Sequence, residues 1–263
     1  MREAMQTQPD KIDPARARAL QATLGYEATL TQGQPLPPFF HQLYFWDPQP
    51  PGALGRDGHP KTGGLIPDMG LPRRMWAGGR LKFHAPLIAG LAAERRSVLE
   101  NTSHKTGRSG PLALITLRHE IWQGGQRCIT EWQDLIYRGN PDPKAARPVP
   151  SKARTDEDTR QQHSFNPTFL FRYSALTFNG HRIHYDRDYA RKVEGYDGLV
   201  VHGPLLAQLL ILMAEKQLGQ LSTFSLRATS ALMDFEGVDL CWKAGDAWAR
   251  GPDGRQIMSA KAS

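Results

Sequence analysis

The sequence predicts an α+β fold in which each half of the chain consists of a helix and an antiparallel meander of strands. Two observations carry this prediction. In both halves, helical start and stop signals stand ahead of β-rich runs that are separated by short Gly-containing turns. A Pro-rich, strongly polar segment lies between the halves, and such a change of composition is typical of a domain boundary. The halves share this order of elements only, so we predict no sequence repeat.

In the first half, residues 10–25 are predicted to form a helix, because Asp13 supplies an N-cap and Pro14 suits the first helical turn. A short buried helix is expected within the aromatic-rich residues 35–46. Residues 47–74 are dense in Pro and Gly and are expected to form a long loop. Loops of this length in compact domains are usually functional or flexible.

The β-rich residues 80–138 predict an antiparallel meander of long strands, with turns at Thr106–Gly110 and Gly124–Gly125. After them the composition shifts to Pro, Gly and charged residues. The predicted division is an N-terminal unit, a linker and a C-terminal unit, at residues 10–140, 141–162 and 163–263.

In the second half we expect a strand at Phe171–Phe178 and a helical turn at Tyr185–Lys192, capped by Asp186. An almost wholly apolar helix follows over Pro204–Leu218 and ends at Gly219. The closing strands are expected at residues 221–232, 239–242, 246–249 and 255–262.

The composition of the 263 residues is that of a soluble protein, with 40% hydrophobic and 22% charged residues. No apolar run reaches membrane-spanning length, and residues 1–9 lack the apolar core of a signal peptide. Cys128 and Cys241 stand far apart, which excludes a disulfide framework and a thiolate zinc site. We therefore expect a cytoplasmic protein with no membrane partner.

The formal charge of +7 has two interpretations: a solvated basic surface, or attraction to an anionic ligand. Nucleic acid is not expected, because the chain has no run of five Lys/Arg and no nucleic-acid-binding signature. Arg73, Arg74 and Arg80 lie close to Trp76 in sequence. They are either surface residues or phosphate contacts, since Arg offers bidentate geometry to phosphate and carboxylate.

A cluster of titratable and amide side chains stands just ahead of the apolar helix, comprising Asn179, His181, His184, Tyr185 and Asp186. It has three interpretations. His181, His184 and Asp186 could bind a metal, but their spacing matches no zinc signature and a fourth ligand is missing, so no metal is expected. The cluster could also be a structural hydrogen-bond network. The third interpretation is general acid–base catalysis by a histidine, the commonest such group.

Gly203, with His202 beside it, stands at the start of the apolar helix. Unpaired N–H groups at a helix N-terminus can stabilise a developing negative charge. A histidine base beside such an oxyanion site suits a reaction through an enolate, such as adding water to a C=C conjugated to a thioester.

The cluster resembles the active-site segment of MaoC-like (R)-specific enoyl-CoA hydratases and 3-hydroxyacyl-thioester dehydratases, whose signature is Asp-x-Asn-Pro-x-His followed by x-Asp. The chain is similar to one branch in particular, that of the itaconyl-CoA and mesaconyl-C4-CoA (3-methylfumaryl-CoA) hydratases and the mitochondrial-type thioester dehydratase. The likeness covers most of the chain, apart from the linker and residues 1–9. The segments that carry it are Leu36–Pro38, Leu71–Arg80, Lys105–Gly110, Gln133–Arg138, Leu176–His184 and Gly198–Leu210.

The resemblance implies a double hot-dog fold, in which two antiparallel sheets each wrap a helix. It implies that the C-terminal half carries the catalytic groups and that the degenerate N-terminal half makes room for the acyl group and CoA. No cofactor is implied, because the CoA thioester is itself the substrate. A homo-oligomer is left open.

The chain departs from the signature, because Asn179, His181 and Arg182 stand where the family has Asp, Asn and Pro, whereas His184 and Asp186 are retained. Asn179 cannot act as a base at neutral pH, so His184 is the expected base, and Asn179 would hold the water or orient an imidazole. His181 is a candidate second acid or base. Asp186 either orients a histidine or caps the next turn, and Arg182 faces solvent or a substrate carboxylate.

The function expected from the resemblance is hydration of a branched C5 dicarboxylyl-CoA, itaconyl-CoA or 3-methylfumaryl-CoA, to citramalyl-CoA. Gly203 and a neighbouring N–H would stabilise the enolate, and Arg73, Arg74 and Arg80 would favour the CoA phosphates and the free carboxylate. Two alternatives stay open: a 3-hydroxyacyl-thioester dehydratase of fatty-acid synthesis, and a non-catalytic acyl-CoA-binding protein. A thioesterase is less expected, because residues 205–213 lack the usual carboxylate.

Overall fold

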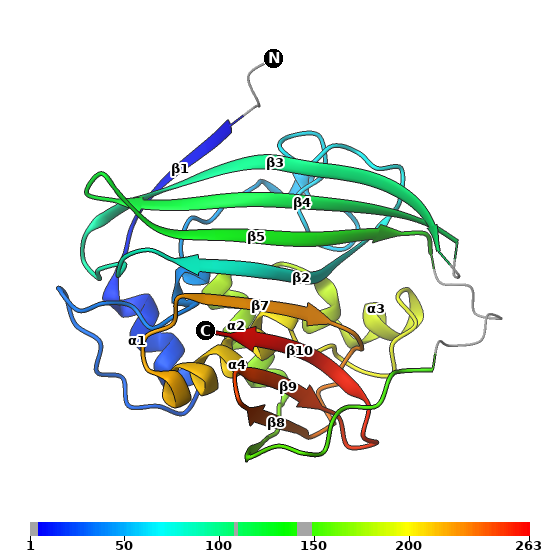
Figure 1. Ribbon diagram of the computed structural model, residues 1–263. Coiled ribbons are helices and arrows are strands. Elements are labelled where there is room, and N and C mark those ends of the chain that lie inside the picture. Colours follow the sequence, from blue (N-terminus) through cyan, green and yellow to red (C-terminus); the bar gives the residue numbers. More distant parts are fainter. Residues whose placement is uncertain (1–4, 108–109, 141–148) are drawn as a thin grey trace.

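A single antiparallel sheet of ten strands organises the molecule (Figure 1). The computed structural model describes residues 5–107, 110–140 and 149–263. The strands run in the order β1-β3-β4-β5-β2-β7-β10-β9-β8-β6. In the first half these are β1 (Met5–Lys11), β2 (Arg73–Phe83), β3 (Ala92–Gly107), β4 (Gly110–Gln123) and β5 (Gln126–Arg138). In the second half they are β6 (Thr159–His163), β7 (Thr223–Ala228), β8 (Val238–Lys243), β9 (Asp246–Arg250) and β10 (Gln256–Ala262).

Helices cover one face of this sheet and fill the space behind the strands in Figure 1. They are α1 (Pro14–Thr23), α2 (Pro167–Thr177), α3 (Arg187–Lys192) and α4 (Gly203–Leu218). Three short 3₁₀ helices accompany them, namely η1 (Phe40–Leu43), η2 (Pro51–Ala53) and η3 (Arg182–His184). In the described residues, α4 packs against β7, β8, β9 and β10, whereas α1 contacts α2 and η1.

The two halves join where β2 pairs with β7. Gly78 permits this junction, because a Cβ there would lie 2.5 Å from the Leu226 carbonyl oxygen of β7. Gly79 serves the other neighbour of β2, since a Cβ there would lie 2.5 Å from the Trp132 carbonyl oxygen of β5. A β-bulge between Trp76 and Gly78 shifts the pairing register with β5 and so changes the direction of the side chains that follow. The sheet therefore continues from one half into the other without an edge between them.

The apolar helix predicted over Pro204–Leu218 is confirmed as α4, and it is the best-buried helix of the second half. Gln208 is the polar residue inside its buried stretch, and the Gln208 amide donates to the Pro38 carbonyl at 3.0 Å. That bond removes the cost of an unsatisfied buried amide. The predicted turn at Tyr185–Lys192 is confirmed as α3, whose N-terminal N–H at Tyr189 is capped by Asp186.

The strand predicted at Phe171–Phe178 is wrong, because these residues belong mostly to helix α2. Asn166 caps this helix by accepting from the Phe169 N–H at 2.9 Å, and Pro167 occupies its first turn. The buried positions Leu170, Tyr173 and Ser174 follow helical spacing, not the alternation of a strand.

The other predicted elements are largely confirmed. Helix α1 begins after the Asp13 cap, and the predicted helix within residues 35–46 is the single turn η1. The meander of residues 80–138 is present, although residues 108–109 of its first turn lie outside the described residues. The strand predicted over residues 221–232 ends earlier, at Ala228. Strand β1, which pairs with β3, was not predicted.

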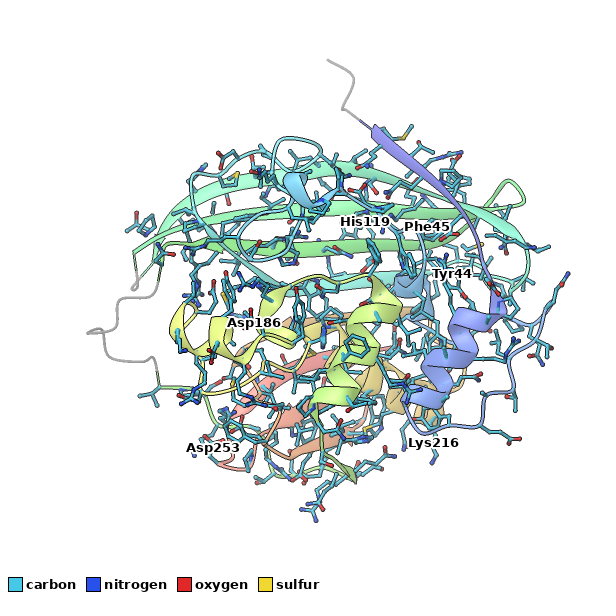
Figure 2. The ribbon with its side chains drawn as sticks, turned by 180° about the vertical axis from the view of Figure 1, so that it is seen from behind. Tyr44, Phe45, His119, Asp186, Lys216 and Asp253 are labelled. Carbon is cyan, nitrogen blue, oxygen red and sulfur yellow. The ribbon has the colours of Figure 1, made fainter. Side chains whose placement is uncertain are left out.

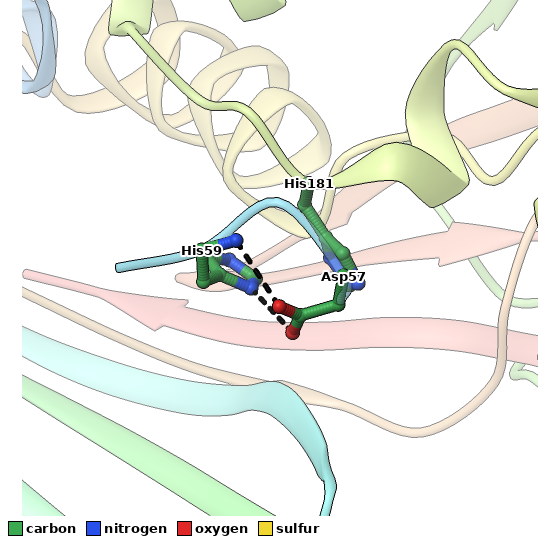
Figure 3. A group of neighbouring side chains, drawn as sticks. All are labelled: Asp57, His59 and His181. Atoms are coloured by element: carbon green, nitrogen blue, oxygen red, sulfur yellow. Dashed lines mark hydrogen bonds and ion pairs between the residues drawn. The ribbon is translucent and has the colours of Figure 1, made fainter. Parts of the chain in front are cut away.

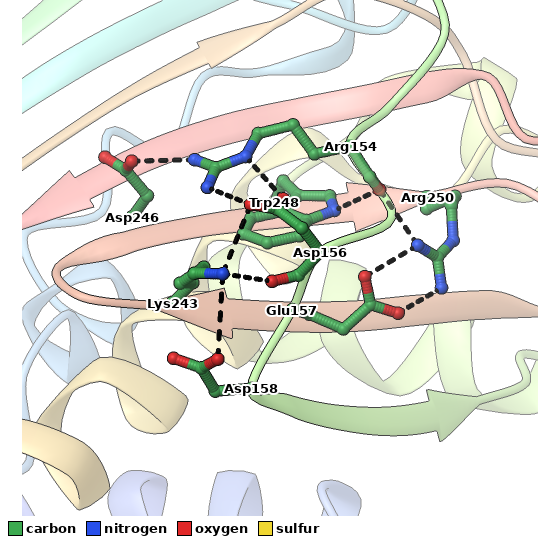
Figure 4. Close-up of polar contacts among 8 residues, drawn as sticks. All are labelled: Arg154, Asp156, Glu157, Asp158, Lys243, Asp246, Trp248 and Arg250. Atoms are coloured by element: carbon green, nitrogen blue, oxygen red, sulfur yellow. Dashed lines mark hydrogen bonds and ion pairs between the residues drawn. The ribbon is translucent and has the colours of Figure 1, made fainter.

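Residues 149–162 of the predicted linker lie against the second half, and residues 141–148 lie outside the described residues. Figure 4 shows how charged side chains hold this segment: Arg154 binds Asp246, and Arg250 binds Glu157. The Arg154 carbonyl also accepts from the Trp248 indole at 3.1 Å. Strand β6 then joins the sheet beside β8. No helix within the described residues is long and apolar enough to cross a membrane.

Replacing Arg250 with Leu is expected to lower the free energy of unfolding by about 2–4 kcal/mol, because it leaves the largely buried Glu157 carboxylate without its cation and leaves Asp239 with Arg160, at 3.8 Å, as its only ion-pair partner among the described residues. Urea unfolding followed by circular dichroism measures this change. The matched control is Lys192→Ala, which removes an exposed ion pair with Asp188 and should cost less than about 0.5 kcal/mol. Equal effects of the two substitutions would contradict this interpretation of the linker contacts.

Candidate active site

A cavity of about 1970 Å³ lies between the two halves and receives side chains from both. The first half contributes parts of residues 39–60 together with β2 and the end of β5. The second half contributes the end of α2, parts of residues 179–206 and parts of residues 228–236. Figure 2 shows Tyr44 and Phe45 of one wall beneath the long strands, and Asp186 on the side of α3. Of the histidines predicted from the sequence, His181 and His184 line this cavity, and His202 lies buried against His184.

His184 is buried in η3, and its tautomer is fixed by one hydrogen bond. The Nδ1 atom lies 2.7 Å from the Val200 carbonyl oxygen. Because a carbonyl can only accept, Nδ1 carries the proton and Nε2 keeps its lone pair. Burial lowers the pKa of His184 to about 4, against an opposing effect of the Val200 bond, so the ring is neutral near pH 7. The neutral ring is ready to accept a proton at Nε2.

The imidazole ring of His202 stacks against that of His184. The two rings stack with centroids 3.6 Å apart and planes inclined by 18°. His202 is fully buried, its Nε2 lies 2.8 Å from the Ser174 hydroxyl, and Nδ1 has no partner in the described part of the chain. Burial lowers the pKa of His202 well below its usual value, and the neighbouring His184 adds to the shift. The stack therefore consists of two neutral rings.

Asn179 and His181 take part in the turn that follows α2. The Asn179 side-chain oxygen accepts from the His181 N–H at 3.0 Å, and the Asn179 N–H donates to the Ser174 carbonyl at 2.8 Å. Both residues line the cavity. Asn179 thus holds the turn that presents His181, and its oxygen is already engaged in that bond.

The residues that sequence reasoning missed are Asp57 and His59, which come from the long loop of the first half. His59 Nδ1 lies 2.9 Å from one Asp57 carboxylate oxygen, and the His59 N–H donates to the other at 3.1 Å (Figure 3). The His59 ring lies 4.3 Å from that of His181, which lies 5.3 Å from that of His184. In the sequence, the one indication of a functional role for these two residues was the length of the loop at residues 47–74. The residues around Asp57 and His59 do not show that this loop contacts the segment that carries His181.

Asp57, His59 and His181 each place one nitrogen or oxygen atom within 4.8 Å of the others. A metal ion would need a similar spacing, but the hydrogen bond from His59 already accounts for the approach of the carboxylate. Burial is the largest single influence and would raise the pKa of Asp57, but the hydrogen bonds and charge of His59, with a smaller effect of His181, together outweigh it and lower the pKa. We therefore interpret the group as an ionised carboxylate that orients an imidazole.

The metal set weighed from the sequence is not assembled, because Asp186 points away from His181 and His184. One Asp186 oxygen accepts from the Tyr189 N–H at 2.9 Å, and the other lies 2.6 Å from the Arg182 guanidinium. Of the two roles open for Asp186, the geometry favours the helix cap. Arg182 also donates to the Arg56 carbonyl at 3.1 Å and is absent from the cavity wall, so the structure does not place it toward a substrate.

Gly203 begins helix α4 at the cavity, directly after His202. Within the described residues its N–H has no protein acceptor, and Pro204 has no N–H to offer. A Cβ at Gly203 would lie 2.9 Å from the Trp76 ring, so only glycine lets the indole pack against this helix end. The exposed N–H at a helix N-terminus can polarise a carbonyl oxygen in the cavity.

The three predicted phosphate-binding arginines have different environments. Arg74 lines the cavity and has no ion pair in the described part of the chain. Arg73 also lines it but is bound to Glu194 at 2.5 Å. Arg80 is exposed, lies 3.6 Å from Asp134 and is not part of the cavity wall. Arg138, which was not predicted, lines the cavity with a buried Nε that has no partner among the described residues.

Solved structures with similar backbones define the fold. Over 98% of this chain, HtdX of Mycobacterium tuberculosis superimposes with a TM-score of 0.70 at 18% identity, covering 99% of that chain. Another M. tuberculosis protein, described as having a double hot-dog fold, matches 100% of this chain and 95% of its own with a TM-score of 0.62 at 12% identity. The fold is therefore the double hot-dog fold, as expected.

Sequence comparisons place the chain in one family with this fold. Residues 39–234 match the family model described as hydroxyacyl-thioester dehydratase type 2, and the chain belongs to this family. A mesaconyl-C4-CoA hydratase of Chloroflexus aurantiacus is 45% identical over 95% of this chain and 92% of its own. The mitochondrial hydroxyacyl-thioester dehydratase type 2 of Schizosaccharomyces pombe is 30% identical over 67% of this chain and 66% of its own.

The buried neutral histidines predict that the protein loses stability as pH falls. Below about pH 6.5 the unfolded imidazoles bind protons, whereas folded His184 and His119 have pKa values near 4. Each of these groups should lower the free energy of unfolding by up to about 1.4 kcal/mol per pH unit between those values. Urea unfolding at pH 7.5, 6.5, 5.5 and 5 tests this, with His184→Asn expected to give a shallower slope. A flat or rising free energy over this range would contradict it.

Proposed function

We propose that this protein is a hydro-lyase that adds water to the C=C of a branched C5 dicarboxylyl-CoA, with 3-methylfumaryl-CoA (mesaconyl-C4-CoA) or itaconyl-CoA as substrate and citramalyl-CoA as product. One observation carries the proposal. The same cavity holds the unprotonated Nε2 of a neutral histidine, His184, and the unpaired N–H of Gly203. The 45% identity to a mesaconyl-C4-CoA hydratase supports this choice of substrate.

In this proposal His184 Nε2 accepts a proton from water as the water oxygen bonds to the β-carbon. The π electrons move toward the thioester carbonyl, and the Gly203 N–H donates to the oxygen as it becomes an enolate. Neutral His184 suits the task because a charged imidazole could not accept the proton. The stacked His202 ring keeps His184 in place.

The cavity also suits a large anionic substrate. Its volume of about 1970 Å³ exceeds the roughly 300–1,000 Å³ of ordinary small-molecule pockets. Arg74 and Arg138 offer donors that no carboxylate of the described residues engages, and Arg191 and Lys192 add positive charge to the wall. We propose that Arg74 binds the free carboxylate of the acyl group and that the other cations bind CoA phosphates.

The second candidate is a 3-hydroxyacyl-thioester dehydratase, which the family description and the S. pombe relative favour. Dehydration is the reverse of the same chemistry, so the two candidates differ in the acyl group and not in the catalytic residues. We propose further that the protein uses no cofactor, because the CoA thioester is its substrate, and that it is cytoplasmic. In this proposal the N-terminal unit comprises residues 10–140 and the C-terminal unit residues 163–263. A homo-oligomer remains compatible with it.

Hydration assays with itaconyl-CoA, 3-methylfumaryl-CoA and crotonyl-CoA test the proposal through loss of enoyl-thioester absorbance. We expect turnover of one of the two dicarboxylyl thioesters. Turnover of crotonyl-CoA alone would favour the dehydratase, and turnover of none would overturn the proposal and favour a non-catalytic acyl-CoA-binding protein.

In the same assay, His184→Gln should lower kcat/KM by about 10²–10⁴-fold, because it removes the proton acceptor. Circular dichroism verifies that the variant folds. The matched control is His163→Gln on edge strand β6, outside the cavity wall, which should keep the wild-type rate. A His184 variant with near-normal kcat/KM would remove His184 from this role.

A further inference from the structure

The proposed hydration needs a second proton transfer that neither Asn179 nor Asp186 supplies. After water adds to the β-carbon, the α-carbon must receive a proton. Asn179 has no titratable proton near neutral pH, and its side-chain oxygen is bound to the His181 N–H. Asp186 caps α3 and pairs with Arg182. His181 is the remaining predicted candidate, but burial and the neighbouring His59 and His184 lower its pKa, which disfavours it as the group that holds this proton.

Asp57 and His59 have the geometry for this task. The Asp57 carboxylate can only accept, so His59 Nδ1 carries the proton and Nε2 keeps its lone pair. This is the arrangement by which a carboxylate fixes the tautomer of a catalytic imidazole and stabilises the imidazolium that forms. Both residues are largely shielded from solvent, and His59 lines the cavity.

Backbone contacts hold the dyad against the catalytic segment. The Arg182 N–H donates to the Asp57 carbonyl at 2.8 Å, and the Arg182 guanidinium donates to the Arg56 carbonyl at 3.1 Å. Gly58 lies so close to Gly180 that a Cβ on Gly58 would be 2.0 Å from the Gly180 carbonyl oxygen. This close approach requires glycine, and it fixes the loop on the segment that carries His181 and His184.

His181 lies between the two candidate proton carriers. Its ring centroid is 4.3 Å from that of His59 and 5.3 Å from that of His184, and all three rings belong to the same cavity wall. The order along the wall is His184, His181, His59 and then the Asp57 carboxylate. His181 thus fills the space between His184 and the fixed negative charge of Asp57, although no hydrogen bond joins the three rings among the described residues.

We propose that Asp57 and His59 form a second catalytic dyad, which delivers to the α-carbon the proton that His184 takes from water. This inference rests on the proposed function. Water loses one O–H bond to His184 Nε2 and forms the O–Cβ bond, and the π pair becomes the enolate. The proton passes by way of His181 to His59, whose Nε2–H gives it to the α-carbon as the enolate collapses. Both imidazoles end neutral, so the cycle needs no other reactant.

If Asp57 and His59 act at the α-carbon, the roles of His59 and His184 can be measured separately. A saturated thioester, methylsuccinyl-CoA, cannot eliminate water but can exchange its α-hydrogens in D₂O through a base at the α-carbon. His59→Gln and Asp57→Asn should lower this exchange, and His59→Gln should lower kcat for hydration by about 10²-fold or more with KM changed only slightly. His184→Gln should lose hydration but keep α-hydrogen exchange, and His163→Gln should retain both.

Mass spectrometry of the recovered thioester measures the exchange. The dyad is overturned if His59→Gln hydrates or exchanges at the wild-type rate, or if wild-type protein that hydrates its substrate exchanges no α-hydrogen. Loss of activity in EDTA that a divalent cation restores would also overturn it, in favour of a metal held by these side chains. A wild-type protein that hydrates none of the thioesters would instead refute the proposed function.

Discussion

The hydrogen bond from His184 to the Val200 carbonyl is the contact on which the chemistry of the cavity depends. This bond fixes the tautomer of the buried ring. Because the carbonyl oxygen can only accept, Nδ1 carries the proton and Nε2 is left unprotonated. Val200 is itself held on both sides: its N–H donates to the Ile183 carbonyl at 2.9 Å, and the next N–H, at Val201, donates to the Leu232 carbonyl at 2.8 Å. A backbone carbonyl thus fixes the tautomer of the base, which has no carboxylate partner among the described residues.

The second constraint is the contact between the two halves of the chain. The double hot-dog fold places a long loop of the first half over the turn that follows α2, and Gly58 and Gly180 meet there backbone to backbone. The first half therefore supplies Asp57 and His59 in addition to space for the substrate. In this arrangement the carboxylate missing from position 179 is compensated by one that comes from a distant part of the sequence.

Local signals in the sequence were sufficient for part of this structure. Pro204 and the apolar run predicted α4, and Asp186 was recognised as a cap for α3. They were insufficient for α2, where the apolar residues after Pro167 were given a strand period. Contacts that depend on the tertiary fold could not be predicted: Asp57 and His59 reach the site from far along the chain, and the outward direction of Arg80 depends on the pairing of β2 with its neighbours.

The central claim is that His184 and the Asp57–His59 dyad act as one catalytic unit built from both halves. A double-mutant cycle in kcat/KM for hydration tests it most directly, with His59→Gln, His184→Gln and the double variant measured on the same thioester. Residues that act as a unit are strongly non-additive, so the double variant should lie within about 3-fold of the more damaged single variant. Losses that multiply across the two sites would show that the histidines act independently, and would contradict the account.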